Sequence, residues 1–153
     1  DEAPTNSLLY SLSMGAYSMG NLNAAAFNLP LNHKVFLAQF DAIKKLAEQG
    51  GCVIVGRCAD YALANYPHLV NVFIYADIKK RAARVAEYEG IPLKEAEERA
   101  LKTDKKRASY YNFYSNKKWG AVESYHLSVD SGAINLDNTA RLILDFAQMK
   151  DPV

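Results

Sequence analysis

Two short apolar runs that do not alternate with polar residues constrain the fold of this chain most strongly. The first is 52–56 (CVIVG) and the second is 70–76 (VNVFIYA), and a helical pattern follows each of them at once. Runs of this kind predict strands of a parallel sheet that is buried on both faces, because helices cover both sides of such a sheet. We therefore expect an α/β fold.

Helical patterns alternate with these strands along the chain. A weak one at 6–19 precedes a loop at 20–32, and a third strand is expected at 125–130. Right-handed crossovers would wrap the parallel sheet with helices on both faces. Three strands are few for this architecture, so we expect that a central part of the sheet is missing. Apolar spacing and terminal signals predict the remaining helices at 33–49, 59–66, 77–90, 92–114 and 136–150.

Length and composition fit one soluble domain. The chain has 153 residues, half of them hydrophobic, a formal net charge of +1 and no apolar stretch long enough to span a bilayer. No signal-peptide pattern opens it, so we expect a cytoplasmic protein without a membrane partner. Cys52 and Cys58 form neither a disulfide framework nor a zinc-like spacing, and Cys52, inside the first apolar run, is expected to be a buried free thiol.

A local charge imbalance marks residues 102–118. This segment carries six basic side chains and one acidic side chain, which leaves 12 basic and 16 acidic residues in the rest of the chain. A concentrated positive segment on a mildly acidic body predicts a local anion site. Three interpretations stay open here: a phosphate-binding face, a solvated basic helix, and a module that uses basic and aromatic side chains at 102–119 to bind single-stranded RNA or to sense a nucleotide.

An arginine, Arg57, stands directly after the first apolar run. Open α/β sheets bind ligands where a strand's carboxyl end leads into a helix, and a guanidinium at that place favours an anion. The alternative is a salt bridge at the start of the next helix, where a positive charge is poorly placed against the helix dipole. We therefore expect Arg57 to bind a phosphate group.

A second group of candidates lies on the long helical segment. Asp104 and Arg107 share one face of this predicted helix, with Lys105 and Lys106 beside them. Positioned cations stabilise the charge that spreads over the oxygens of a transferring phosphoryl group. From spacing alone, the simpler interpretation is a solvated face with an Asp104–Arg107 pair worth about 0.3–0.5 kcal/mol.

Several of these segments together resemble bacterial cytidylate kinase-like proteins, relatives of the nucleoside monophosphate kinases in the P-loop NTPase superfamily. The resemblance implies a three-layer α/β/α fold, with one domain over 1–153 and a lid-like helical excursion at 92–120. It extends from Thr5 onward and rests on CVIVGRCADYAL, VNVFIYA, TDKKRASYYNFYSNKKWG and YHLSVDSG.

The Gly-rich phosphate-binding loop that such proteins carry near their first strand is not recognisable. Gly15 and Gly20 have its spacing, but Asn21 and Leu22 follow where the loop requires Lys and then Ser or Thr. We expect these two glycines to end a helix. We also expect the chain to be truncated at its N-terminus, without the phosphate-binding loop and the central strand.

The resemblance assigns roles to the candidate residues. Arg57 would hold the phosphate of a nucleoside monophosphate, and Asp104 would contact its base or sugar. Arg107, helped by Lys105 and Lys106, would neutralise the transferring phosphates. The implied activity moves the γ-phosphoryl group of ATP to a cytidylate-like acceptor, with Mg²⁺ held by phosphates and water and no metal site in the protein.

Two further positions extend this assignment. Tyr75 stands where related kinases place an aspartate that contacts cytosine. With a phenol at this position, the resemblance does not determine which base the acceptor nucleotide carries. Ser131 follows the last strand, near the expected position of the donor base, although a plain turn residue is an equal alternative. The segment 6–19 would suit a dimer surface or a lid, and a small nucleotide is favoured over nucleic acid as the partner.

Overall fold

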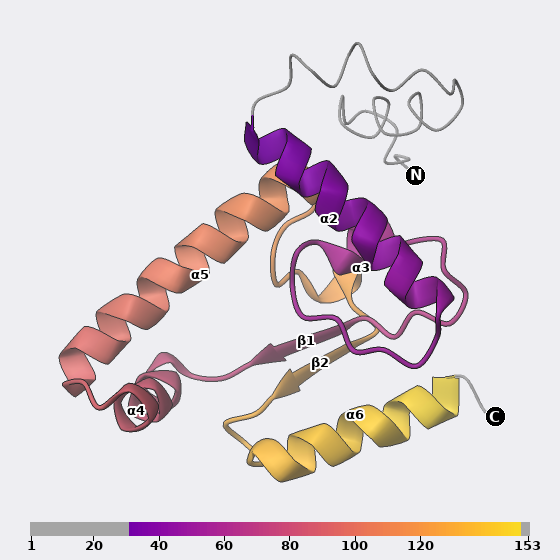
Figure 1. The fold of residues 1–153 in the computed structure, drawn as a ribbon. Helices are drawn as coiled ribbons and strands as arrows, with labels where there is room; N and C mark the ends of the chain where they lie inside the picture. Colours follow the sequence, from indigo (N-terminus) through magenta and orange to yellow (C-terminus); the bar gives the residue numbers. More distant parts are fainter. Residues whose placement is uncertain (1–30, 151–153) are drawn as a thin grey trace. The chain divides into compact units, whose positions relative to one another are not determined.

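The computed structural model describes residues 31–150, and the expectations for 6–19, for most of the loop at 20–32 and for Gly15 and Gly20 lie outside them. The described residues form two compact units: residues up to Tyr66 together with Tyr114–Asn116, and Pro67–Phe113 together with the chain from Lys117 onward. The elements, labelled in Figure 1, are α2 (Leu31–Glu48), α3 (Ala59–Ala62), β1 (Val72–Tyr75), α4 (Ile78–Glu89), α5 (Leu93–Ser115), the 3₁₀ turn η3 (Val122–Ser124), β2 (Leu127–Asp130) and α6 (Leu136–Lys150).

The first unit is built on α2, which begins two residues before the predicted start and otherwise confirms the prediction. Its buried residues include Phe36, Ile43 and Ala47, whose spacing places them on one face of the helix. Phe36 stacks on Tyr114 with ring centroids 4.1 Å apart, and the Tyr66 hydroxyl donates to the carbonyl oxygen of Ala47 at 2.9 Å. This aromatic packing provides much of the unit's small core.

The second unit contains a parallel pair of strands, as the sequence predicts. β1 and β2 run in register from Val72 opposite Leu127 to Tyr75 opposite Asp130, and Figure 1 shows them side by side. The connection between them passes through α4 and α5, which is the long crossover that parallel strands require. Helix α6 packs against β2. The prediction of an α/β chain with a parallel sheet is confirmed at this level.

Local signals set the ends of α4, α5 and α6 close to the predicted positions. The Asp77 carboxylate accepts a hydrogen bond from the backbone N–H of Lys79 at 2.9 Å, which caps the start of α4. Gly90 ends that helix in the left-handed conformation with φ 67°. α6 spans Leu136–Lys150 as predicted, and Asn135 caps its start through the N–H of Asn138.

The first apolar run contradicts the prediction. Residues 52–56 form no strand, and Val53 and Val55 are 95% and 87% exposed. Cys52 is exposed, whereas Cys58 is the buried thiol, so the expectation for Cys52 is wrong as well. A strand needs a partner for its backbone N–H and C=O groups, and within residues 31–150 only β1 and β2 pair.

Two smaller expectations also differ from the structure. β1 is not buried on both faces, because Ile74 and Tyr75 are 53% and 47% exposed. The helix expected at 59–66 is reduced to the single turn of α3, followed by turns that lead to Pro67. Among residues 31–150, no helix combines the length and the apolar character that crossing a membrane requires.

Candidate functional site

The carboxyl ends of β1 and β2 meet at one edge of the sheet, and cations from α4 gather there. The backbone N–H of Ser131, just past β2, donates to the carbonyl oxygen of Tyr75 at 2.8 Å. Only two residues separate the end of β1 from the start of α4, so the first turns of α4 present Lys80, Arg81 and Arg84 to this edge. The Lys80 ammonium donates to the carbonyl oxygen of Gly132 at 2.7 Å.

Arg84 fixes the turn that follows β2. Its guanidinium donates to the hydroxyl oxygen of Ser131 at 3.0 Å and to the carbonyl oxygen of the same residue at 2.7 Å. The Ser131 hydroxyl in turn donates to the carbonyl oxygen of Tyr75 at 3.1 Å, and the residue is 3% exposed. The hydroxyl is thus engaged as donor and as acceptor, and its predicted place near a donor base stays a prediction.

Gly132 lies in a tightly packed part of this turn, where a side chain would force its neighbours to move. A Cβ atom added there would lie 2.8 Å from Cδ of Lys80 and 3.0 Å from a carboxylate oxygen of Asp130. That same carboxylate accepts a hydrogen bond from the Gly132 N–H at 2.8 Å. The strand end therefore carries a close-packed turn, held by two cations of α4.

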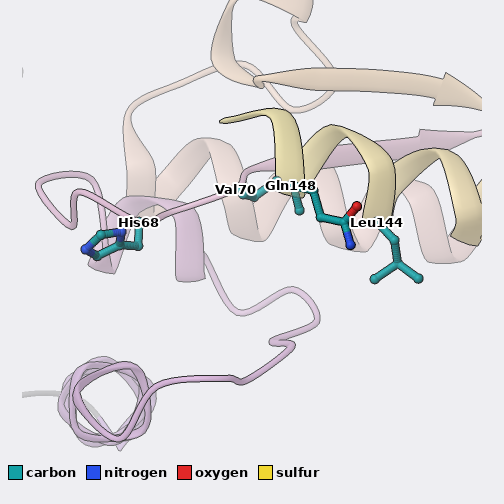
Figure 2. A pocket seen from close by; sticks show the side chains of 5 residues that line it. His68, Val70, Leu144 and Gln148 are labelled. Carbon is teal, nitrogen blue, oxygen red and sulfur yellow. The ribbon is translucent and has the colours of Figure 1, made fainter. Parts of the chain in front are cut away.

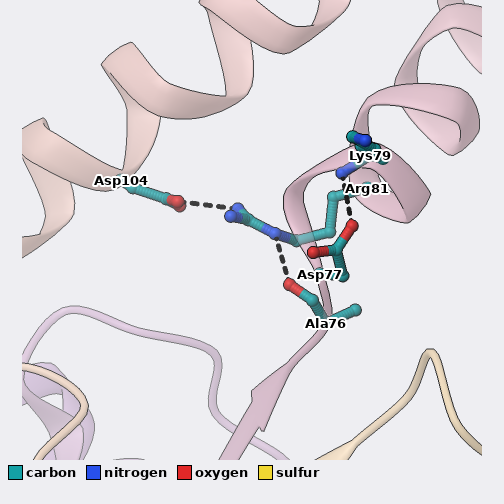
Figure 3. Close-up of polar contacts among 5 residues, drawn as sticks. All are labelled: Ala76, Asp77, Lys79, Arg81 and Asp104. Atoms are coloured by element: carbon teal, nitrogen blue, oxygen red, sulfur yellow. Dashed lines mark hydrogen bonds and ion pairs between the residues drawn. The ribbon is translucent and has the colours of Figure 1, made fainter.

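Arg81 connects the end of β1 to α5, as Figure 3 shows. Its Nε–H donates to the carbonyl oxygen of Ala76 at 2.9 Å, and its Nη1 donates to Oδ2 of Asp104 at 2.7 Å. The two side chains are 30% and 23% exposed. Asp104 thus pairs with Arg81, and within residues 31–150 it forms no ion pair with Arg107, so the intrahelical pair of the simpler interpretation is absent.

Sequence reasoning missed Arg81, Arg84 and Lys80. The available signal was their position, because cations in the first turns of a helix that follows a parallel strand lie at the ligand-binding edge. Nothing in the spacing pointed to Asp104 as a partner, since 23 residues separate it from Arg81.

The other predicted residues of α5 lie beside this pair. Lys105, Lys106 and Arg107 are exposed, and none of their side chains has a hydrogen bond or an ion pair within residues 31–150. The structure therefore brings Asp104 and three available cations together on one stretch of helix. Tyr75 ends β1 at the same edge of the sheet with its side chain 47% exposed, and its predicted contact with a base stays a prediction.

Arg57 belongs to the first unit and occupies a strained turn. Gly56, Arg57 and Cys58 have φ values of 72°, 57° and 54°, so two residues with a Cβ atom adopt the left-handed conformation before α3. This conformation costs roughly 1–2 kcal/mol for each such residue, and strain of this kind is concentrated at functional sites. The exposed Arg57 side chain makes no salt bridge within residues 31–150, contrary to the structural alternative. Its approach to the cations of α5 stays a prediction.

Burial changes the acidity of two groups near this turn. The pKa of the Cys58 thiol is raised to about 12, first by burial and then by the negative charge of Asp60. Burial, followed by a smaller contribution from Cys58, also raises the pKa of Tyr114. The buried thiol is therefore protonated and unreactive at neutral pH.

The loop that follows α5 is anchored on β1 by aromatic side chains. Phe73 lies edge-on to Trp119 with ring centroids 5.4 Å apart, and 4.9 Å from the ring of Tyr125. Gly120 has φ 76°, and a Cβ atom there would lie 3.2 Å from Cζ of Phe73. The Tyr125 hydroxyl accepts a hydrogen bond from the Gly120 N–H at 3.3 Å. These contacts hold the end of the excursion against the sheet.

A shallow cavity of about 300 Å³ lies elsewhere in the second unit. It is lined by His68 and Val70 from the segment before β1 and by Leu144, Ala147 and Gln148 of α6, as Figure 2 shows. This is the amino-terminal side of β1, whereas parallel sheets bind ligands at the carboxyl ends of their strands. Among residues 31–150, no three His, Cys, Asp or Glu side chains form a group that could hold a metal ion.

The second unit thus has the architecture of an α/β protein whose parallel strands end beside basic side chains of α4. Its parallel strands end at a close-packed turn, and a paired carboxylate and exposed cations lie next to this edge of the sheet.

Comparison with known proteins agrees with this class. The family model described as the cytidylate kinase-like family matches residues 1–133, and the chain belongs to this family. A solved structure of an uncharacterised protein from Eubacterium ventriosum is 33% identical, with a TM-score of 0.73 over 77% of this chain and 74% of that one. No curated protein matches the chain.

Proposed function

We propose that this protein is a nucleoside monophosphate kinase-like phosphotransferase that moves the γ-phosphoryl group of ATP to a cytidylate-like monophosphate. One observation carries the proposal. Arg81 holds the Asp104 carboxylate at the carboxyl end of β1, and Lys105, Lys106 and Arg107 follow it on α5, exposed and without ion pairs in the described part of the chain. Membership of the cytidylate kinase-like family supports a kinase and a nucleotide ligand.

The cations suit the charge that develops during phosphoryl transfer. Arg107 offers a planar fork that can contact two phosphate oxygens at once, whereas Lys105 and Lys106 act as point charges. Fixed cations of this kind stabilise the negative charge on the transferring group without reorganisation of solvent. Mg²⁺ arriving with ATP would neutralise further charge on the β- and γ-phosphates.

The acceptor would be held by groups of both signs. In this proposal, Arg57 binds its phosphate, and the strained turn at 56–58 keeps that side chain exposed at the start of α3. Asp104 accepts a hydrogen bond from the base or sugar through Oδ1, which has no hydrogen bond or ion pair within residues 31–150. Tyr75 borders the acceptor base, and Ser131 borders the donor base.

A nucleotide-binding experiment tests the proposal directly. Calorimetric titrations would use CMP, UMP, AMP and ATP with Mg²⁺, because no segment of the sequence matches the phosphate-binding loop and binding can be measured without turnover. We expect a pyrimidine monophosphate to bind and Arg107→Ala to weaken ATP about tenfold or more, which corresponds to one lost charged hydrogen bond. Lys94→Ala, near the exposed start of α5, is the control and should have no effect.

An RNA-binding surface predicts a different result. In that case an oligonucleotide would bind and its affinity would fall steeply between low and physiological salt, while the mononucleotides would give no heat. This pattern would contradict the proposed phosphotransferase. Coupled measurement of ADP release with CMP as acceptor then tests the transfer step itself.

A further inference from the structure

We propose that Arg81 is a positioning residue for this reaction: it sets the Asp104 carboxylate, and with it the cationic stretch of α5, against the carboxyl end of β1. The inference rests on the proposed function and adds a residue to its site.

The guanidinium of Arg81 is fixed from the side of the sheet. Its Nε–H binds the carbonyl oxygen of Ala76, the first residue after β1, at 2.9 Å. The backbone N–H of Arg81 donates to the carbonyl oxygen of Asp77, the residue that caps α4, at 3.0 Å. Ala76 itself is buried, at 8% exposure. The guanidinium of Arg81 is therefore held in place by the end of β1, independently of its contact with α5.

Arg81 and Asp104 are joined by a single hydrogen bond, although a guanidinium and a carboxylate can form two. Nη1 of Arg81 binds Oδ2 at 2.7 Å, while Oδ1 of Asp104 and Nη2 of Arg81 have no partner within residues 31–150. The carboxylate is 23% exposed, so its second oxygen can accept a hydrogen bond from a ligand. A carboxylate held in this way is oriented before the ligand arrives, which lowers the entropic cost of binding.

The Arg81–Asp104 ion pair joins α5 at the residue directly before its exposed cations, Lys105, Lys106 and Arg107. α5 has 23 residues, or about 35 Å at 1.5 Å per residue. Its residues 101–107 are exposed or half-buried, and in the described part of the chain the Arg81–Asp104 ion pair links this stretch to the strand end. Loss of the pair would release the stretch that carries Lys105, Lys106 and Arg107.

Arg99 provides a matched control on the same helix. It pairs with Glu89 of α4 and with Glu95 one turn earlier on α5. Like Arg81, it connects α4 to α5 through a carboxylate, but it lies more than one turn from Asp104 and has no contact with the strand end. Arg99→Ala therefore removes a similar interhelical pair without touching the proposed site.

Hydrogen exchange tests the positioning role without any nucleotide. Amide exchange over residues 101–107 would be followed by mass spectrometry in the unsubstituted protein and in Arg81→Ala, Asp104→Asn and Arg99→Ala. We expect exchange in this segment to accelerate about tenfold in the first two variants and to stay unchanged in Arg99→Ala, because exchange reports local opening. Unchanged exchange in Arg81→Ala would overturn the inference.

Titration with CMP tests the connection to binding. Arg81→Ala and Asp104→Asn should each weaken binding about tenfold, and the double variant no more than either one, because residues that act as a unit are not additive. Arg81→Lys should recover part of the loss, since an ammonium can reach one of the two partners. Additive losses of about a hundredfold in the double variant would show that Arg81 acts independently of Asp104 and overturn the inference. If the unsubstituted protein binds no monophosphate, the proposed function fails, and the exchange result alone decides on Arg81.

Discussion

Replacement of Gly120 by alanine should lower the free energy of unfolding in two ways, through the backbone conformation of this residue and through crowding against Phe73. The residue has φ 76°, which costs roughly 1 kcal/mol or somewhat more for any residue with a Cβ atom. Its Cβ would also lie 3.2 Å from Cζ of Phe73, and Trp119 and Tyr125 pack against that ring and limit its movement. Overpacking of this kind costs about 1–3 kcal/mol, so we expect about 2–4 kcal/mol in total.

Gly90→Ala isolates the conformational part of that cost. Gly90 has φ 67° and no atom within 4 Å of an added Cβ, so alanine there should cost only about 1 kcal/mol. Both glycines belong to the second unit, and the chain's single tryptophan, Trp119, reports its unfolding by fluorescence. Urea titrations should give a free energy of unfolding that falls two to four times as far for Gly120→Ala as for Gly90→Ala, by the same sum of costs. Equal losses would refute the packing of Phe73 against the loop.

Four further predictions concern the first unit. A thiol reagent at pH 8 should modify exposed Cys52 and spare buried Cys58 until the protein unfolds, and modification of both in the folded state would contradict the burial. The raised pKa of Cys58, about 12 against an ordinary 9.0, means that its contribution to stability is present below pH 9 and is lost as the pH rises toward 12, which urea titrations across that range should detect. Phe36→Ala should cost about 3–5 kcal/mol in urea unfolding, because it removes a buried ring stacked on Tyr114, and a loss below 1 kcal/mol would contradict that packing. Arg57→Ala should abolish the thermal stabilisation by a monophosphate, and an unchanged shift would remove Arg57 from the site.

The elements that the sequence predicts well are those with signals inside a few residues. Asp77 caps α4, Gly90 ends it, and α5 begins directly after Pro92. Capping and left-handed termination depend on neighbouring backbone groups, so such patterns locate these helices within one or two residues.

The features that the sequence did not predict depend on partners far along the chain. The run at 52–56 has strand-like composition, but composition does not supply a neighbouring strand, and Val53 and Val55 are exposed. The pairing of Asp104 with Arg81 likewise joins two helices across 23 residues, whereas helical spacing points only to partners three or four residues away. The sequence therefore predicted the individual candidates Lys105, Lys106 and Arg107, but it did not predict the Arg81–Asp104 ion pair beside them.

The most direct test of the central claim is amide chemical-shift mapping during titration with CMP. We predict that the largest shifts fall on Ala76, on residues 104–107 and on Arg57, with little change at Leu144 beside the cavity of α6. Shifts confined to the cavity residues, or no shifts at millimolar CMP (about 4 kcal/mol of binding free energy), would contradict a nucleotide site at the carboxyl ends of the strands.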